Sequence, residues 1–181
     1  MALIVLAHPD MNNSIANKTI INELNNKAPE FEIRDIFKEN PNYIIDINRE
    51  QKALQRHNVI VFQYPMYWYN MPAILKIWLD QVFSYQFAYG SLGDKLKGKH
   101  LIPSITVGQP ERNFQESGQL SLMDKLLLPV QKTAEYAQMN FHKPIVLYDT
   151  STVAGHPESE IVYNARIHSS KILERIDSVT R

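Results

Sequence analysis

The sequence predicts an α/β fold in which a doubly wound parallel sheet is covered by helices on both faces. Apolar runs of strand length alternate with longer segments of helical spacing along the whole chain. Parallel strands require this alternation, because a helix must carry the chain back before the next strand begins. The runs are nearly continuous in apolar residues, which is typical of strands buried on both faces. We therefore expect residues 1–181 to form a single domain.

The first half of the chain contains three predicted pairs of strand and helix. The expected elements are the strands Leu3–Ala7, Phe31–Ile36 and Val59–Phe62 and the helices Ser14–Ala28, Arg49–His57 and Ala73–Tyr85. Pro72 is tolerable in the first turn of the third of these helices. The stripe that this helix is expected to bury contains Ile74, Ile77, Trp78, Gln81 and Val82.

The second half is predicted to add two more pairs. The expected elements are the strands Leu101–Val107 and Ile145–Tyr148 and the helices Pro129–Met139 and Pro157–Ile176. Pro103 lies in the fourth apolar run and weakens the prediction for the first half of that strand. The closing helix is expected to bury Ile161, Ala165, Ile172 and Ile176.

Composition restricts the kinds of partner that the protein can have. Nineteen acidic and nineteen basic residues leave no net charge at pH 7, so no bulk field attracts nucleic acid or anionic lipid. The chain has no cysteine, so any redox function must use a cofactor. The first apolar run is too short for a signal peptide, and no run reaches membrane-spanning length. We expect a cytoplasmic protein.

Aromatic residues gather directly after the third predicted strand. The strand leads into a loop, between Pro65 and Pro72, that holds Tyr67, Trp68 and Tyr69. Rings that only fill a core are usually spaced along a helix or strand face, whereas rings in one fixed loop can form a wall for a flat ligand. Ligands of doubly wound sheets sit outside the carboxyl ends of the strands. This loop therefore predicts a site for a planar cofactor.

The loop after the first strand, His8–Asn17, predicts an anion site. It brings hydroxyl, amide and imidazole groups to the amino end of a helix, where free N–H groups and the helix dipole favour phosphate. Ser14 and Asn17 can add donors there, and His8 adds a partly titrating cation. The alternative is plain capping of the helix by Ser14 or Asn13.

The loop after the fourth strand, Thr106–Phe114, is a third candidate. Gly108 has no Cβ, so the backbone there can approach the edge of a ring. The alternative is a simple turn, because glycine and proline close together are common in loops.

Two other kinds of site are disfavoured by spacing. Gly93–His100 nearly matches a nucleoside-triphosphate P-loop, but His100 replaces the magnesium-binding Ser or Thr. The segment also leads into a strand, whereas a P-loop opens a helix. The six histidines show no paired-ligand spacing, so no metal is expected.

Several segments together resemble one family. They are Ala7-His8-Pro9, Ser14 with Ala16-Asn17, Asp46-Ile47 with Glu50-Gln51, Pro65-Met66-Tyr67-Trp68-Tyr69, Pro72-Ala73-Ile74-Leu75-Lys76 with Trp78-Leu79-Asp80, Phe87-Ala88-Tyr89-Gly90 and Leu96-Lys97-Gly98-Lys99. With them the chain resembles the NAD(P)H:quinone oxidoreductase group of flavodoxin-like flavoproteins. It is most similar to the ancillary proteins of glutathione-gated Kef potassium-efflux systems. The resemblance implies a flavodoxin-like, doubly wound, five-stranded parallel sheet of strand order 2-1-3-4-5.

The resemblance also implies a function. It indicates an FMN-dependent NAD(P)H oxidoreductase that transfers two electrons to quinones or similar electrophiles. FMN is expected rather than FAD, because the extra tail of longer relatives is absent. Such proteins are homodimers with the flavin near the subunit boundary. The alternative is a regulatory flavoprotein subunit of the potassium-efflux transporter with little turnover of its own, held by that partner at the inner face of the membrane.

Finally, the resemblance assigns residues to the flavin. The phosphate and ribityl chain are expected to contact His8, Ser14, Ile15, Ala16 and Asn17. The ring is expected to lie against Pro65, Met66, Tyr67, Trp68 and Tyr69, with its polar edge at Thr106, Val107, Gly108 and Gln109.

Two departures bear on catalysis. Quinone reductases usually carry Thr-Thr-Gly-Gly and then a tyrosine, whereas this chain has Gln109 and, further on, Phe114. Phe114 cannot donate a proton, so no catalytic residue is assigned.

A one-electron flavodoxin carrier is disfavoured by the neutral charge, because such carriers typically find their partners through a strongly acidic surface.

Overall fold

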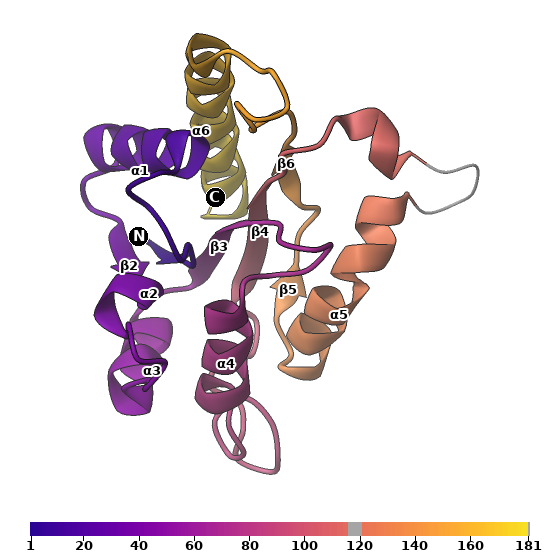
Figure 1. The fold of residues 1–181 in the computed structure, drawn as a ribbon. Helices are drawn as coiled ribbons and strands as arrows, with labels where there is room; N and C mark the ends of the chain where they lie inside the picture. The colour runs from indigo at the N-terminus through magenta and orange to yellow at the C-terminus, as the bar shows by residue number, and fades with distance from the viewer. Residues whose placement is uncertain (116–120, 181) are drawn as a thin grey trace.

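A computed structural model of the chain, which describes residues 1–115 and 121–180, has a parallel sheet between two layers of helices (Figure 1). The strands are β1 (Ala2–Leu6), β2 (Glu32–Asp35), β3 (Val59–Pro65), β4 (His100–Thr106), β5 (Asn140–Phe141) and β6 (Ile145–Leu147). Their order is β2-β1-β3-β4-β5, every pairing is parallel, and β6 also pairs with β4. The predicted doubly wound sheet and its strand order are therefore confirmed.

The last strand position is divided between β5 and β6, and Pro103 in β4 explains the division. Alternate residues of β4 face this edge: the carbonyl of Leu101 accepts from the N–H of His142, and the N–H of Val107 donates to Leu147. By the same alternation the nitrogen of Pro103 faces the same edge, opposite the gap between β5 and β6. Proline has no N–H to donate, so the ladder cannot continue there. On its other side Pro103 keeps its register with Phe62 of β3.

Helices cover both faces of the sheet. They are α1 (Ile15–Lys27), α2 (Ile36–Glu39), α3 (Ile47–Arg56), α4 (Ala73–Val82), α5 (Leu122–Tyr136) and α6 (Glu158–Thr180), with a 3₁₀ turn η1 (Glu111–Phe114). One core packs α1 and α6 against side chains such as Ile4, Val61 and Ile102. The opposite core packs α3, α4 and α5 against side chains such as Val5, Phe62 and Ile105. The central strands β1, β3 and β4 therefore send alternate residues into the two cores, as strands buried on both faces must.

Two helix predictions need correction. Helix α5 begins at Leu122 and not at Pro129, because Ser121 and Asp124 form a capping box that starts the helix about two turns earlier. In α4, Ile77 and Gln81 are only partly buried, while Leu75 and Leu79 join Trp78 on the buried side. The buried side of α6 contains the predicted apolar residues and, in addition, His168 and Ser169.

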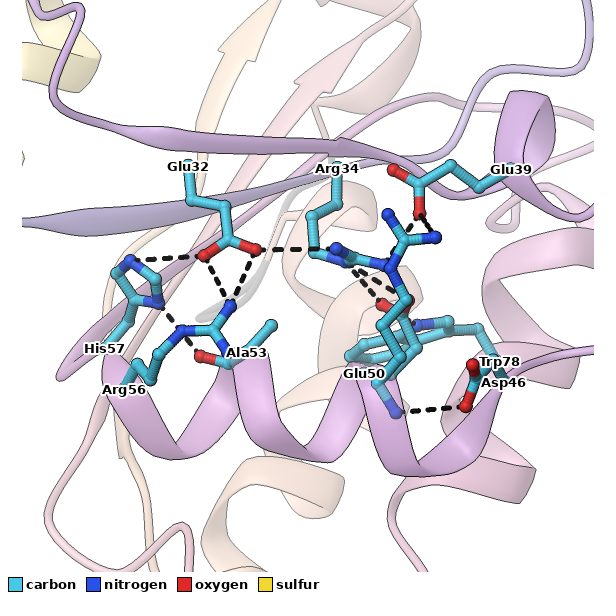
Figure 2. Close-up of polar contacts among 10 residues, drawn as sticks. Glu32, Arg34, Glu39, Asp46, Glu50, Ala53, Arg56, His57 and Trp78 are labelled. Atoms are coloured by element: carbon cyan, nitrogen blue, oxygen red, sulfur yellow. Dashed lines mark hydrogen bonds and ion pairs between the residues drawn. The ribbon is translucent and has the colours of Figure 1, made fainter.

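A cluster of charged residues lies where β2 meets α3 (Figure 2). Arg34 donates through Nε to both carboxylate oxygens of Glu50, at 3.1 and 3.0 Å, and through its terminal nitrogens to Glu50, Glu39 and Glu32. The indole N–H of Trp78 donates to Glu50 at 2.9 Å. Arg34 and Glu50 are only 5% and 1% exposed. The cluster therefore ties an edge strand to α3 and α4 through a buried ion pair.

The described helices include none that is long and apolar enough to cross a membrane. Within residues 1–115 and 121–180, no group of three or more histidine, aspartate or glutamate side chains is arranged to hold a metal ion.

Candidate functional site

Two adjoining cavities open beyond the carboxyl ends of β1, β3 and β4. The first has a volume of about 370 Å³ and the second about 320 Å³, and Met66 and Gly108 line both. Of the residues predicted to bind a cofactor, the first cavity is lined by His8, Ser14, Ile15, Ala16, Asn17, Pro65, Met66, Tyr67, Thr106 and Gly108. The second is lined by Met66, Trp68, Tyr69, Val107, Gly108 and Gln109. The fold thus brings three loops, far apart in sequence, to two neighbouring cavities that share Met66 and Gly108.

The first cavity has the donor groups that a phosphate requires. Ser14 caps α1, where its Oγ accepts from the backbone N–H of Asn17 at 3.2 Å, and the first turn of the helix has no acidic residue. The predicted cap and the predicted anion site therefore coincide and do not exclude each other. The hydroxyl residues that line the cavity are Ser14, Tyr67, Thr106, Thr150, Ser151 and Thr152. Hydroxyls and helix N–H groups can all donate to phosphate oxygens, so this donor set fits a phosphoryl group.

The surroundings of His8 favour its neutral ring over the partly titrating cation expected from the sequence. Burial lowers the pKa of His8, and the nearby carboxylates of Asp10 and Asp35 only partly offset this effect. The side chain is 7% exposed, and its Nδ1 accepts from the backbone N–H of Asp10 at 3.0 Å. In the neutral ring the proton therefore lies on Nε2.

The aromatic loop is held in a strained turn. Tyr67 and Asn70 exchange backbone hydrogen bonds of 2.9 and 3.0 Å, and the two residues between them, Trp68 and Tyr69, have φ angles of 47° and 62°. Such a turn favours Asn and Gly, because a Cβ is disfavoured at positive φ. Two bulky aromatic residues in this conformation are unusual, and backbone strain of this kind clusters at functional sites. The Trp68 side chain is 93% exposed and stands at the wall of the second cavity.

The second cavity is lined mainly by rings and by a close backbone approach. The rings of Tyr69 and Phe114 have centroids 6.2 Å apart, and Phe114 is itself buried against Tyr148. A Cβ at Gly108 would lie 3.2 Å from the Cβ of Ser151, so glycine permits the two loops to meet here. The N–H of Val107 donates to Leu147 at 2.7 Å and holds the loop against β6. This cavity suits a flat, largely apolar group.

Sequence reasoning missed part of the first cavity. The hydroxyl residues Thr150, Ser151 and Thr152 line it but were not predicted. Asp10 and Asn13 also line it and lie within the predicted loop, but they were not assigned to the cofactor. The hydroxyl residues follow the fifth predicted strand at its carboxyl end, which is the position where ligands of this kind of sheet bind. Their position after that strand could therefore have identified them. The carboxylate of Asp10 is held by two hydrogen bonds from Asn13, at 3.3 and 2.7 Å.

Comparison with known families decides the classification. A family model described as a flavodoxin-like fold matches residues 1–170. The chain belongs to this flavodoxin-like family. The cavities described above lie at the carboxyl edge of the sheet, where proteins of this sheet order bind their ligands.

Three similar proteins give this membership more detail. The chain is 40% identical over 149 residues to the uncharacterized NAD(P)H oxidoreductase YrkL of Bacillus subtilis (strain 168). The aligned residues make up 82% of this chain and 85% of that protein. It is 30% identical, with a TM-score of 0.85 and 98% of each chain covered, to general stress protein 14 of Treponema denticola in complex with FMN. It is 35% identical, with a TM-score of 0.86, to a protein described as a thermophilic tryptophan halogenase from Streptomycin violaceusniger, over 94% of this chain and 98% of that one.

Proposed function

We propose that this protein is an FMN-dependent NAD(P)H oxidoreductase that transfers two electrons to quinones or similar electrophiles. The observation that carries the proposal is the joining of two unlike cavities: a hydroxyl-lined one at a helix N-terminus and a ring-lined one beside it. FMN has the same two parts, a phosphate and a flat ring, and when bound it would supply the two-electron chemistry. The names of two relatives, an NAD(P)H oxidoreductase and an FMN complex, support this choice over halogenation.

The chain's own residues have distinct tasks in this proposal. Ser14 to Asn17 and His8 hold the phosphate. Thr106, which the resemblance placed at the polar edge of the ring, lines the first cavity and not the second, so here it adds a hydroxyl donor to the phosphate. Met66 to Tyr69 form the wall against the ring, and Gly108 and Gln109 bring backbone to its polar edge. Phe114 supplies hydrocarbon and no proton, so any proton required by the acceptor comes from solvent or another group. In this proposal the protein's own part is therefore to hold and orient the reactants.

Two protein partners are considered in addition to the electron acceptor: a second copy of this chain and a membrane transporter. The homodimer that the resemblance implies is included in the proposal. The alternative of a transporter subunit and the cytoplasmic location stay predictions, because none of the relatives named above is described by either property.

The test is a titration followed by an assay. Purified protein is mixed with FMN, and binding is followed by flavin absorbance and by quenching of flavin fluorescence. The loaded protein is then given NADH or NADPH with a quinone, and the flavin-stripped protein serves as the control. We expect bound yellow flavin and nicotinamide oxidation that depends on both FMN and quinone. Protein that stays colourless after incubation with FMN would refute the proposal.

Replacing Trp68 with Ala is expected to weaken FMN binding by about 1 to 3 kcal/mol, because stacking and packing against the ring are lost. The exposed indole makes little contribution to the folded core, so the thermal stability of the flavin-free protein should not change. Tyr136→Ala is the matched control, since Tyr136 is also an exposed aromatic residue but lines a different cavity. Equal FMN affinity in the Trp68 variant and the control would exclude this role for Trp68.

A further inference from the structure

A chain of buried polar side chains runs beneath the first cavity, on the face of the sheet that α1 and α6 cover. His168 Nε2 of α6 lies 2.7 Å from the Oγ of Ser104 in β4. Ser104 donates its hydroxyl proton to Oε1 of Gln63 in β3 at 2.6 Å, and Gln63 Nε2 donates to Oδ1 of Asn17 in α1 at 2.8 Å. Each of the four is at most 2% exposed, so each must find its partners within the protein.

The chain ends on two hydroxyls that face the cavity. Asn17 Nδ2 donates to Thr106 Oγ1 at 2.9 Å and to Ser14 Oγ at 3.2 Å. Ser14 Oγ also accepts from the backbone N–H of Asn17, so both of its lone pairs are engaged. The hydroxyl of Ser14 can therefore act toward a ligand only as a donor. Thr106 Oγ1 also accepts from Asn17, so its proton is free to point away from Asn17. Both residues line the first cavity.

The direction of every bond in this chain is linked to the next. Ser104 gives its single proton to Gln63, so the bond between Ser104 and His168 must be donated by the histidine Nε2–H. Burial lowers the pKa of His168 to about 4, so the ring is neutral at pH 7 and has one proton to place. The donors thus run in one direction, from α6 through both strands to α1 and the cavity.

If the donors ran in the opposite direction, the first cavity would present acceptors in place of donors. If Gln63 turned its oxygen toward Asn17, the amide of Asn17 would have to turn as well and present its own oxygen to Ser14 and Thr106. Both hydroxyl protons would then be drawn to Asn17, and the cavity would meet oxygen lone pairs. A phosphate at pH 7 accepts hydrogen bonds and repels lone pairs, so only the first direction suits it.

We propose that Gln63 is a positioning residue that orients Asn17, so that the hydroxyls of Ser14 and Thr106 are held as donors to a phosphate. This inference rests on the proposed function, because FMN is the ligand whose phosphate would occupy the cavity. It assigns to the buried amide a selectivity for phosphorylated over unphosphorylated flavin, although Gln63 itself does not line the cavity.

The experiment is a double-mutant cycle on FMN affinity, with riboflavin as the matched ligand that lacks the phosphate. Thr106→Val removes one hydroxyl donor and is expected to raise the Kd for FMN about tenfold. Gln63→Glu replaces the donating NH₂ with an oxygen of nearly the same size and should turn Asn17 round. In the Gln63→Glu background Thr106 no longer donates to the phosphate, so Thr106→Val should then change the Kd by about twofold or less. Riboflavin affinity should change by less than about twofold throughout.

Two controls separate orientation from charge and from misfolding. Asn13→Asp puts a carboxylate on the cavity wall but changes no member of the buried hydrogen-bond network. Its repulsion of FMN should weaken with added salt, whereas the loss of FMN affinity caused by Gln63→Glu should not. If thermal melts show that the Gln63→Glu variant is not folded, Gln63→Leu, which introduces no charge, replaces it in the double-mutant cycle with Thr106→Val.

The inference is overturned if Thr106→Val costs the same factor with and without Gln63, or if FMN and riboflavin lose affinity together. Failure of the wild-type protein to bind FMN would instead overturn the proposed function.

Discussion

Replacing Arg34 with methionine is expected to lower the free energy of unfolding by about 3 to 5 kcal/mol. The guanidinium of Arg34 is the main counter-charge of Glu50, whose carboxylate is 1% exposed (Figure 2). Without it Glu50 keeps only the indole N–H of Trp78 among the partners described above. A buried carboxylate with no counter-ion must either remain desolvated and charged or take up a proton, and both outcomes destabilise the fold.

Urea unfolding of the variant and the wild type measures this loss. Arg56→Met is the matched control, because Arg56 is exposed and its ion pair with Glu32, at 2.8 Å, should contribute less than about 1 kcal/mol. Adding Glu50→Gln to Arg34→Met removes the unpaired charge and should recover part of the stability. If Arg34→Met and Arg56→Met lower the free energy of unfolding by the same amount, the buried pair of Arg34 and Glu50 is no more important for stability than an exposed one.

Acidification from pH 7 to about pH 5 is expected to lower the free energy of unfolding by about 2 kcal/mol through His168 alone. Burial, with a smaller contribution from Lys171, lowers the pKa of His168 from 6.5 to about 4. Between these two pKa values the unfolded chain binds a proton that the folded chain does not. The stability that the neutral ring supports is therefore present above about pH 6.5 and is lost as the pH falls toward 4.

The comparison of His168→Gln with the wild type isolates this effect. Glutamine can donate to Ser104 through its amide but does not titrate, so unfolding of the variant should depend less on pH by about 2 kcal/mol over this interval. His8 and His142 also have pKa values lowered by burial and act in the same direction, and both remain in the variant. Parallel profiles for the two proteins would show that His168 does not contribute.

The sequence by itself determined the order of strands and helices and the loops that form the site. Runs such as Leu3–Ala7 and Val59–Phe62 are apolar at every position, and this local pattern is enough to predict strands buried on both faces. Once five such strands are parallel, the loops after them must meet at one edge. For this reason the sequence alone assigns the His8 loop, the Trp68 loop and the Gly108 loop to one site.

The tertiary structure alone decided which polar residues lie inside. Gln63, Ser104 and His168 come from two strands and a distant helix, and their hydrogen bonds join residues 41 and 64 positions apart in the chain. His168 falls at the spacing of the buried stripe of α6, but the pattern cannot say whether a polar residue there has a partner. The division of the last strand opposite Pro103 and the ion pair of Arg34 with Glu50 depend equally on neighbours across the sheet. Local periodicity reports which face of an element is buried, whereas the satisfaction of buried polar groups is a property of the packed whole.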